Sequence, residues 1–207
     1  MNDTIIRRAA LSDIPYLYEI CLKTGNSGKD ASDLFNDPYI IGQYYAAPYL
    51  LFSEGICFAA EHDHRPQGYI IAVPDTGGFN RWMEEVWLPP LRERYPQPFP
   101  PEMFRSEKER GILASFHQSH FPLDADDQLL FKNYPAHLHI DLLPSLQGKG
   151  IGRSLINCLC EELARMGIPG VHLGVGKQNT GAVAFYQKIG FTVLQEKDWG
   201  YVMGFTV

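Results

Sequence analysis

Three glycines at alternate positions mark the segment of this sequence with the clearest chemical potential. Gly148, Gly150 and Gly152 lie where a strand-like segment gives way to a helix-like one. Because glycine has no side chain, backbone amides there can approach an anion closely, and the start of a helix favours negative charge. Lys149 and Arg153 add cationic donors. The segment predicts a diphosphate site, with an ordinary glycine-rich turn as the alternative.

Two common phosphate-binding fingerprints do not fit this segment. In the P-loop pattern the lysine is followed by serine or threonine, whereas Gly150 follows Lys149. In the Rossmann pattern the third glycine would fall at Arg153, and the acidic ribose-binding residue would fall near His172, where no acidic residue stands. The sequence therefore predicts a different kind of diphosphate loop.

The segment QGKGIG at 147–152 resembles the Q/R-x-x-G-x-G/A pyrophosphate loop of the GNAT acetyltransferases. The preceding Leu142, Leu143 and Pro144 resemble the end of that family's fourth strand. Downstream, NTGAVAFYQKIGF at 179–191 is similar to the family's N-x-x-A-x-x-F-Y-x-K-x-G-F block. The clear match covers 136–206, and the earlier part of the chain fits the same fold less specifically.

The resemblance implies an acetyl-CoA-dependent N-acetyltransferase that acts by direct attack of a primary amine of a small molecule or a peptide. It implies that coenzyme A is contacted by Leu142, Leu143, Gln147, Gly148, Lys149, Gly150, Ile151, Gly152, Arg153, Ser154, Asn179 and Tyr186. Backbone amides near Leu142 and Leu143 match the family's usual oxyanion donors. Tyr186 is expected near the cofactor sulfur, where it gives the departing thiolate a proton. A packing role for Tyr186 and a helix N-cap role for Asn179 are the alternatives.

One strand face gathers the candidates for the amine's base. His137, His139 and Asp141 share a face because side chains alternate along a strand. Burying a carboxylate costs several kcal/mol unless it is paired with a cation or stays hydrated. Asp141 is therefore expected to face a cavity or a cation, as the general base or the anchor of the amine, with a structural hydrogen bond as the alternative. His139 and His172 are further candidates for substrate contacts, and Gly174 leaves room for substrate or cofactor.

The elements that must position these residues alternate in type after residue 135. The expected strands are 5–8, 55–61, 68–73, 136–143, 171–175, 191–194 and 201–206. The expected helices follow Ser12 or cover 38–45, 79–86, 106–118, 153–166 and 180–189. This order predicts an α/β (α+β) fold with a mixed sheet and helices on both faces. The resemblance narrows it to a GNAT-like, mostly antiparallel sheet with one parallel, splayed strand pair.

Length and composition predict one domain over 1–207, with a helical or irregular insertion at about 74–135. The net charge of −6 argues against a nucleic-acid partner. No apolar run reaches the roughly 18 residues that a membrane span needs. The four cysteines form no C-x-x-C pair and predict buried free thiols in a cytoplasmic protein. Residues 62–64 predict a solvated turn, so no metal site is expected there. The sequence does not predict the oligomeric state.

A narrower resemblance is to the acetyltransferase-like carboxy-terminal domain of O-GlcNAcases. It rests on YLYEIC at 16–21, on WLPPLRERY at 87–95 within the insertion, and on Ile140 and Asp141. These matches suggest a stand-alone relative of that domain that keeps the cofactor loop. A non-catalytic acyl-CoA-binding or protein-interaction module is the alternative function. Thermal stabilisation by acetyl-CoA and thiol release with amines separate the two.

Overall fold

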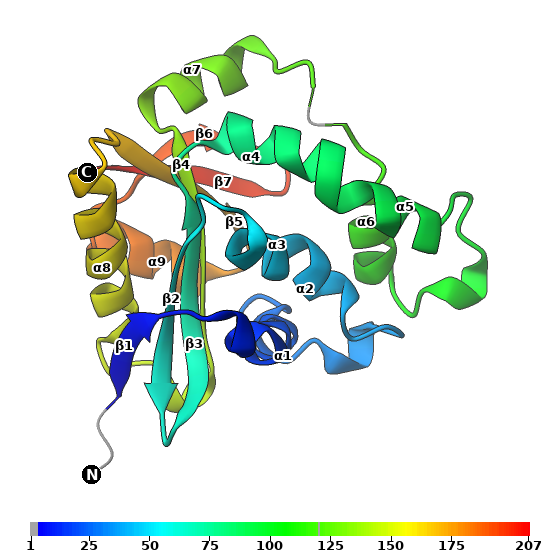
Figure 1. Ribbon diagram of the computed structural model, residues 1–207, viewed down its shortest axis with the longest axis horizontal. Coiled ribbons are helices and arrows are strands. Elements are labelled where there is room, and N and C mark those ends of the chain that lie inside the picture. The colour runs from blue at the N-terminus through cyan, green and yellow to red at the C-terminus, as the bar shows by residue number, and fades with distance from the viewer. Residues whose placement is uncertain (1–3, 120) are drawn as a thin grey trace.

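A mixed sheet forms the centre of the computed structural model, which describes residues 4–119 and 121–207 (Figure 1). Within these residues it has seven strands in the order β1-β2-β3-β4-β5-β7-β6. Their bounds are β1 Ile5–Arg8, β2 Ile56–His62, β3 Arg65–Val73, β4 Ala136–Leu142, β5 Gly170–Gly176, β6 Thr192–Glu196 and β7 Gly200–Thr206. Every neighbouring pair is antiparallel except β4 and β5. The expected mostly antiparallel sheet with one parallel pair is confirmed.

The parallel pair divides the sheet into two parts. β4 and β5 are in register only at Ala136 with Val171 and at His137 with His172. Beyond these positions β4 stays paired with β3 as far as Leu142, and β5 stays paired with β7 along its whole length. The two strands therefore separate toward their carboxyl ends, and a wedge opens between them.

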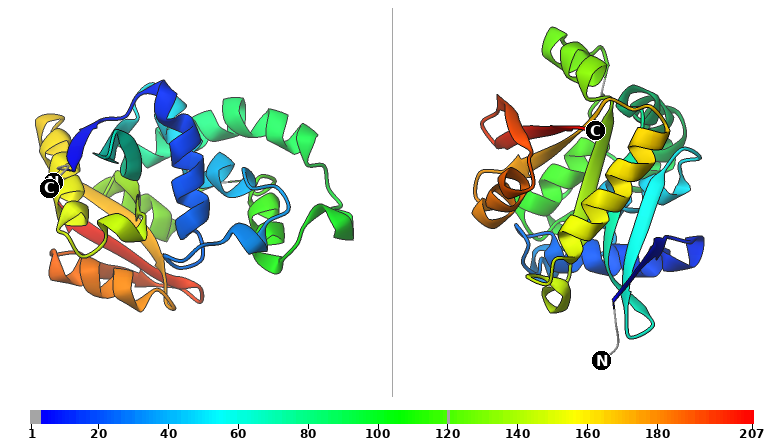
Figure 2. Two further views of the ribbon diagram at one scale, coloured as in Figure 1. Left: turned by 90° about the horizontal axis from the view of Figure 1, so that it is seen from below. Right: turned by 90° about the vertical axis from the view of Figure 1, so that its left-hand side faces the viewer.

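Helices cover both faces of the sheet, as expected (Figures 1 and 2). α8 (Ile151–Arg165) and α9 (Thr180–Lys188) share one hydrophobic cluster with the strands. α8 faces the sheet with Leu155, Leu159 and Leu163, which recur every four residues and are fully buried. The other face packs against α1 (Ile14–Thr24), α2 (Ile40–Tyr45) and α3 (Ala47–Leu51) in a second cluster.

The segment between β3 and β4 is more regular than its prolines suggest. It holds α4 (Thr76–Trp82), a π-helical turn (Met83–Trp87), α5 (Leu88–Arg94), α6 (Glu107–Ser115) and α7 (Ala125–Asn133). α4, the turn and α5 form one continuous rod that extends past the sheet (Figure 1). Pro89 and Pro90 fall in the first turn of α5, directly after the π-helical turn. The sequence analysis missed α3, α5 and α7.

A buried carboxylate ties this segment to the rest of the fold. Glu109 of α6 is fully buried and accepts the backbone amides of Asn36, Asp37 and Arg105 at 2.7–3.0 Å. Several charge-assisted hydrogen bonds offset the cost of burying the charge. α6 is thereby fixed against the loop that precedes α2.

Two smaller expectations can be compared with the structure. Cys21 and Cys57 are buried, but Cys158 and Cys160 on α8 are partly exposed. The expectation of four buried thiols is wrong for these two, because they flank the apolar stripe of α8 rather than lie on it. In the described part of the chain, no helix combines the length and apolar character needed to span a bilayer.

Candidate active site

The glycine-rich loop lies between the end of β4 and the start of α8. Gly148 has a φ of +71° and Gly150, the N-cap of α8, has a φ of +82°, values that favour glycine. Among the described residues, no atom lies within 4 Å of a Cβ built at either position. The loop is therefore bare on its outer side, at the positive end of a helix of 15 residues.

The other loop residues have distinct positions. Lys149, Arg153 and Ser154 are exposed around the helix start. Gln147 turns back, and its Nε2 donates to the carbonyl oxygen of Leu142 at 2.9 Å. Gly152 is buried instead, and a Cβ there would lie 3.1 Å from Phe185 of α9. The third glycine of the motif serves close packing of α8 against α9, not access to an anion.

The amides of Leu142 and Leu143 point to opposite sides of β4. The Leu143 N–H donates to the carbonyl oxygen of Gln67 in β3 at 2.8 Å, so it is already occupied. Because backbone groups alternate along an antiparallel strand, the N–H and C=O of Leu142 point away from β3 and toward the wedge. Of the two predicted oxyanion donors, the geometry leaves the Leu142 amide.

Tyr186 and Asn179 belong to α9, on the other side of the wedge. Tyr186 is buried, and burial followed by the nearby charge of Asp141 raises the pKa of its hydroxyl. This hydroxyl keeps its proton at neutral pH and can act as a donor. The Asn179 side chain caps α9, since its Oδ1 accepts the Ala182 amide at 3.2 Å. Of the two roles predicted for Asn179, the structure shows that of a helix N-cap.

Asp141 projects from β4 onto the face covered by α1. Its Oδ2 accepts a hydrogen bond from the Tyr69 hydroxyl at 2.7 Å. Burial raises the pKa of the carboxyl to about 6, although hydrogen bonds from Tyr69 and Thr24 act in the opposite direction. A carboxyl that titrates near pH 6 can take up a proton and release it again near neutrality. A general base has this property.

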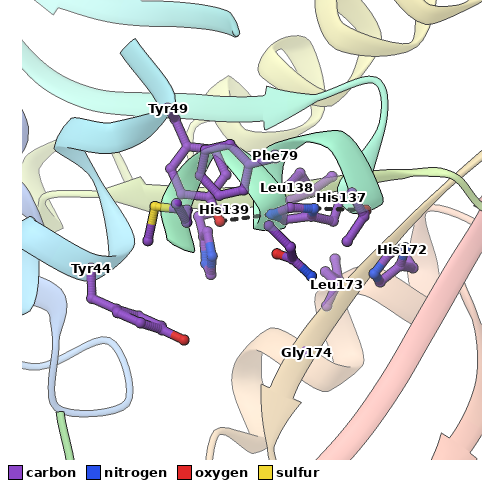
Figure 3. A pocket seen from close by; sticks show the side chains of 12 residues that line it. Tyr44, Tyr49, Phe79, His137, Leu138, His139, His172, Leu173 and Gly174 are labelled. Atoms are coloured by element: carbon purple, nitrogen blue, oxygen red, sulfur yellow. Dashed lines mark hydrogen bonds between the residues drawn. The ribbon is translucent and has the colours of Figure 1, made fainter. Parts of the chain in front are cut away.

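A cavity of about 180 Å³ opens beside the point where β4 and β5 separate (Figure 3). Its walls come from α2, α3, α4, the π-helical turn that follows α4, β4 and β5. The residues lining it are Tyr44, Tyr49, Thr76, Phe79, Asn80, Met83, His137, Leu138, His139, His172, Leu173 and Gly174. The three weaker substrate candidates, His139, His172 and Gly174, thus meet at one place. The sequence analysis missed the walls from α3 and α4, which no local motif marks.

Three histidines line this cavity, and burial disfavours the charged form of two of them. Burial lowers the pKa of His139 to about 4 and also lowers that of His172. His172 Nδ1 donates to the carbonyl oxygen of Tyr134 at 2.8 Å, which fixes its tautomer. His137 lies between the hydroxyls of Tyr49 and Thr76, at 2.8 Å from each. His139 and His172 therefore carry no imidazolium charge at neutral pH.

The described His, Cys, Asp and Glu side chains do not gather into a group of metal-ligand type. In residues 4–119 and 121–207, no group of three or more His, Cys, Asp or Glu side chains is arranged to hold a metal ion.

Comparison with known proteins places this geometry in a family. The model of the acetyltransferase (GNAT) family matches residues 88–191, half of the chain. The chain belongs to the GNAT acetyltransferase family. A crystal structure described as SsHAT is 30% identical, superposes with a TM-score of 0.86, and covers 99% of this chain and 98% of its own.

More distant GNAT proteins share the fold or part of the sequence. The paia N-acetyltransferase from Thermoplasma acidophilum, in complex with coenzyme A, covers 99% of each chain with a TM-score of 0.56 and 16% identity, a likeness of fold alone. The ribosomal protein bS18-alanine N-acetyltransferase of Escherichia coli is 28% identical over 53% of this chain and 64% of its own. The curated relatives are matched over 27% to 64% of their own lengths.

The GNAT site of this chain combines three chemical parts. A bare helix start lies at the open end of the wedge, and one strand amide points into the wedge. A carboxyl with a raised pKa lies on β4 next to this amide, and an uncharged cavity lies where the wedge closes. Such an arrangement can hold an anion at one end and position a nucleophile at the other.

Proposed function

We propose that this chain is an acetyl-CoA-dependent N-acetyltransferase that acts by direct attack of a primary amine of a small molecule or peptide. The observation that carries the proposal is the order of parts along the wedge between β4 and β5. The bare loop at 147–152 lies at its open end, and the cavity lies where it closes. Acetyl-CoA, when bound, supplies an activated acetyl thioester.

The loop has the features that a diphosphate requires. Gly148 and Gly150 expose backbone without side chains, and Lys149 and Arg153 project around it as cations. The first amides of α8 have no partners within the helix and carry its positive end. These groups are proposed to hold the pyrophosphate of coenzyme A, as the bound coenzyme A of the fold relative from Thermoplasma acidophilum suggests.

Three groups are proposed to act on the reacting atoms. The Leu142 amide donates to the carbonyl oxygen as it gains negative charge. Asp141 accepts the amine proton, which its pKa of about 6 permits at neutral pH. Tyr186 donates to the departing sulfur, since its hydroxyl stays protonated. Each of these proposed roles is testable by substitution.

Two further expectations belong to this proposal. The chain is proposed to act as one domain over 1–207, in which the insertion at about 74–135 contributes α4 to the acceptor cavity. It is also proposed to be a stand-alone relative of the carboxy-terminal domain of O-GlcNAcases, on the resemblance at 16–21 and 87–95. An acceptor amine on a peptide has precedent in relatives named for ribosomal protein bS18 and for peptidyl-lysine.

The experiment has two stages that separate binding from catalysis. Acetyl-CoA at about 100 times its dissociation constant stabilises a binder by about 2.7 kcal/mol, which raises Tm by roughly 5–10 °C. Thiol release is then measured with a panel of primary amines. Stabilisation together with amine-dependent thiol release supports the transferase. Stabilisation without turnover identifies a binding module instead, and no stabilisation overturns the proposal.

A further inference from the structure

Trp199 exposes most of a large apolar side chain beside the candidate site. Its relative exposure is 59%, although an indole is costly to leave in water. It lies in the tight turn between β6 and β7, where Lys197 N–H donates to Gly200 O at 2.8 Å. The carbonyl oxygen of Trp199 accepts the Lys177 N–H at 3.3 Å. Its backbone is therefore held from both sides.

The indole of Trp199 reaches the cavity at Gly174. A Cβ built on Gly174 would lie 2.9 Å from Trp199 Cη2 and 3.3 Å from Cζ3. Gly174 is one of the residues that line the cavity, on the same strand face as His172. The indole edge thus occupies the place of the missing side chain at 174. Trp199 is not itself one of the lining residues, but its indole lies next to one of them.

The cavity walls are uncharged and rich in flat rings. Among the twelve described residues that line it, none is Asp, Glu, Lys or Arg. Tyr44, Tyr49 and Phe79 contribute aromatic rings, and two of the histidines add neutral imidazoles. A cavity of about 150 Å³ can hold a benzene molecule. The volume of about 180 Å³ therefore suits a single ring on a short chain.

We propose that Trp199 forms the outer wall of the acceptor pocket and that the acceptor is an arylalkylamine, a primary amine joined to an aromatic ring by a short chain. The ring packs among the aromatic walls and against the indole. The amine then extends toward the wedge, because Leu138 and Leu173 at the cavity directly follow the last paired positions of β4 and β5. This inference rests on the proposed transferase function.

The opposite acceptor class would require different walls. A polyamine or a lysine side chain within a basic peptide brings further cations, which carboxylates would have to meet. The lining holds no such group among the residues described. The cavity is also too small for a large folded surface to enter. Uncharged walls of this size favour an acceptor with one amine and an apolar body.

The first test compares four acceptors with the full chain and acetyl-CoA: 2-phenylethylamine, 2-cyclohexylethylamine, spermidine and a lysine-containing peptide. The expected kcat/KM for 2-phenylethylamine exceeds that for spermidine and the peptide by at least about tenfold. It also exceeds that for 2-cyclohexylethylamine, which has similar size but no aromatic face. A preference for spermidine or the peptide, or equal rates for the two ring compounds, would overturn the inference.

The second test changes the outer wall. Trp199→Ala is expected to raise KM for 2-phenylethylamine about fivefold to tenfold with kcat nearly unchanged, because an aromatic contact is lost. Trp199→Phe should recover most of this loss. Val193→Ala, on the strand that precedes the turn, removes another exposed apolar side chain and should leave KM unchanged. An equal KM in Trp199→Ala and Val193→Ala would overturn the role of Trp199.

Calorimetry separates this inference from the proposed function. Binding of 2-phenylethylamine to the wild-type protein saturated with coenzyme A needs no turnover. If no amine is acetylated but this binding weakens about fivefold or more in Trp199→Ala, the acceptor pocket stands and the transferase proposal falls. If amines are acetylated but 2-phenylethylamine neither binds nor reacts, the transferase proposal stands and the arylalkylamine inference falls.

Discussion

The cofactor loop and the acceptor cavity lie at opposite ends of one wedge and are built in different ways. The loop consists of six consecutive residues, 147–152, and its shape follows from two glycines with positive φ at the start of one helix. The cavity draws its walls from six elements that are spread along the chain from Tyr44 to Gly174. The loop is encoded locally, whereas the cavity exists only once the whole fold has formed.

The two ends also differ in charge and exposure. Lys149 and Arg153 stand exposed beside the loop, while the cavity holds two neutral histidines between aromatic rings. A change at the loop should therefore weaken the use of every acceptor to the same extent, through the cofactor. A change at the cavity should affect acceptors differently. Substitutions at each end can break or sharpen this contrast.

The largest effect is expected at the loop. Gly150→Asp places a side chain and a negative charge where the phosphates are proposed to bind, in a left-handed conformation that disfavours it. We expect acetyl-CoA affinity to fall by at least about 100-fold, as measured by calorimetry, because a charge is repelled and an anion site is blocked.

A matched control stands at the other end of the same helix. Gly167 follows α8 and has a φ of +72°, again with no described atom within 4 Å of a built Cβ. Gly167→Asp carries the same backbone strain and the same charge, but its charge lies at the negative end of the helix, so it should lose somewhat more stability than Gly150→Asp. If both variants bind acetyl-CoA equally well, the loop is not the phosphate site.

The same contrast explains what the sequence could predict. The loop, the strands after residue 135 and the packing of α8 were predictable because glycine patterns and apolar periodicity are local signals. Tyr49, Phe79 and Trp199 could not be assigned to the site, because their approach depends on how α3, α4 and the last hairpin pack. The occupied Leu143 amide depends in the same way on its partner Gln67 in β3. Helix α7 is weakly amphipathic and follows a proline-containing loop, so periodicity did not reveal it.

The next largest effect is expected at the carboxyl between the two ends. Asp141→Asn removes the proposed base and should lower kcat about 100-fold. In the parent protein, the base works only when deprotonated. Since the pKa of Asp141 is about 6, kcat/KM should fall as the pH drops below that value. Steady-state rates from pH 5 to pH 8 measure both effects. Asp126→Asn on α7 is an exposed control that should change neither.

Tyr69→Phe sharpens this assignment. The Tyr69 hydroxyl donates to Asp141 and lowers the pKa of the carboxyl, so its removal should move the acidic limb of the kcat/KM profile to higher pH.

A folded-state pKa above the usual value also means that ionised Asp141 costs stability. This cost is absent below about pH 4 and complete above pH 6. Asp141→Asn should therefore raise Tm by a few degrees at pH 7.5 but not at pH 4. An unshifted limb in Tyr69→Phe would contradict the role of Asp141.

A smaller effect is expected for the proton donor on α9. Tyr186→Phe keeps the ring that packs against Phe185 and Phe191 but removes the hydroxyl. Because a thiolate leaves readily without a proton donor, we expect kcat to fall only about tenfold, which is less than general acid catalysis usually contributes. The dissociation constant of acetyl-CoA should stay within about twofold. Tyr39→Phe, on an exposed ring, serves as control. Parent-like turnover in Tyr186→Phe would show that another group protonates the sulfur.

The smallest effect on catalysis is expected at residues that hold the cavity wall in place and do not touch the reacting atoms. The Thr76 hydroxyl lies 2.7 Å from the carbonyl oxygen of Pro135, which can only accept, so Thr76 donates there. His137 Nδ1 must then donate to Thr76 Oγ1, and its Nε2 accepts from the Tyr49 hydroxyl. The chain of donors fixes the tautomer of His137 and the position of the Tyr49 ring.

Thr76→Val removes the hydroxyl at nearly constant volume and leaves a buried N–H without its acceptor. We expect a loss of about 1–3 kcal/mol in the free energy of unfolding by urea, with kcat changed less than about threefold because no reacting atom is touched. Nitrogen NMR should find the Nδ1–H tautomer of His137 in the parent and a loss of that preference in the variant. An imidazolium at pH 7, or the Nε2–H tautomer in the parent, would refute the donor chain. A large fall in kcat would instead mean that His137 takes part in proton transfer. The cavity wall would then contribute to the reaction, and the contrast between a reacting wedge and a supporting wall would be wrong.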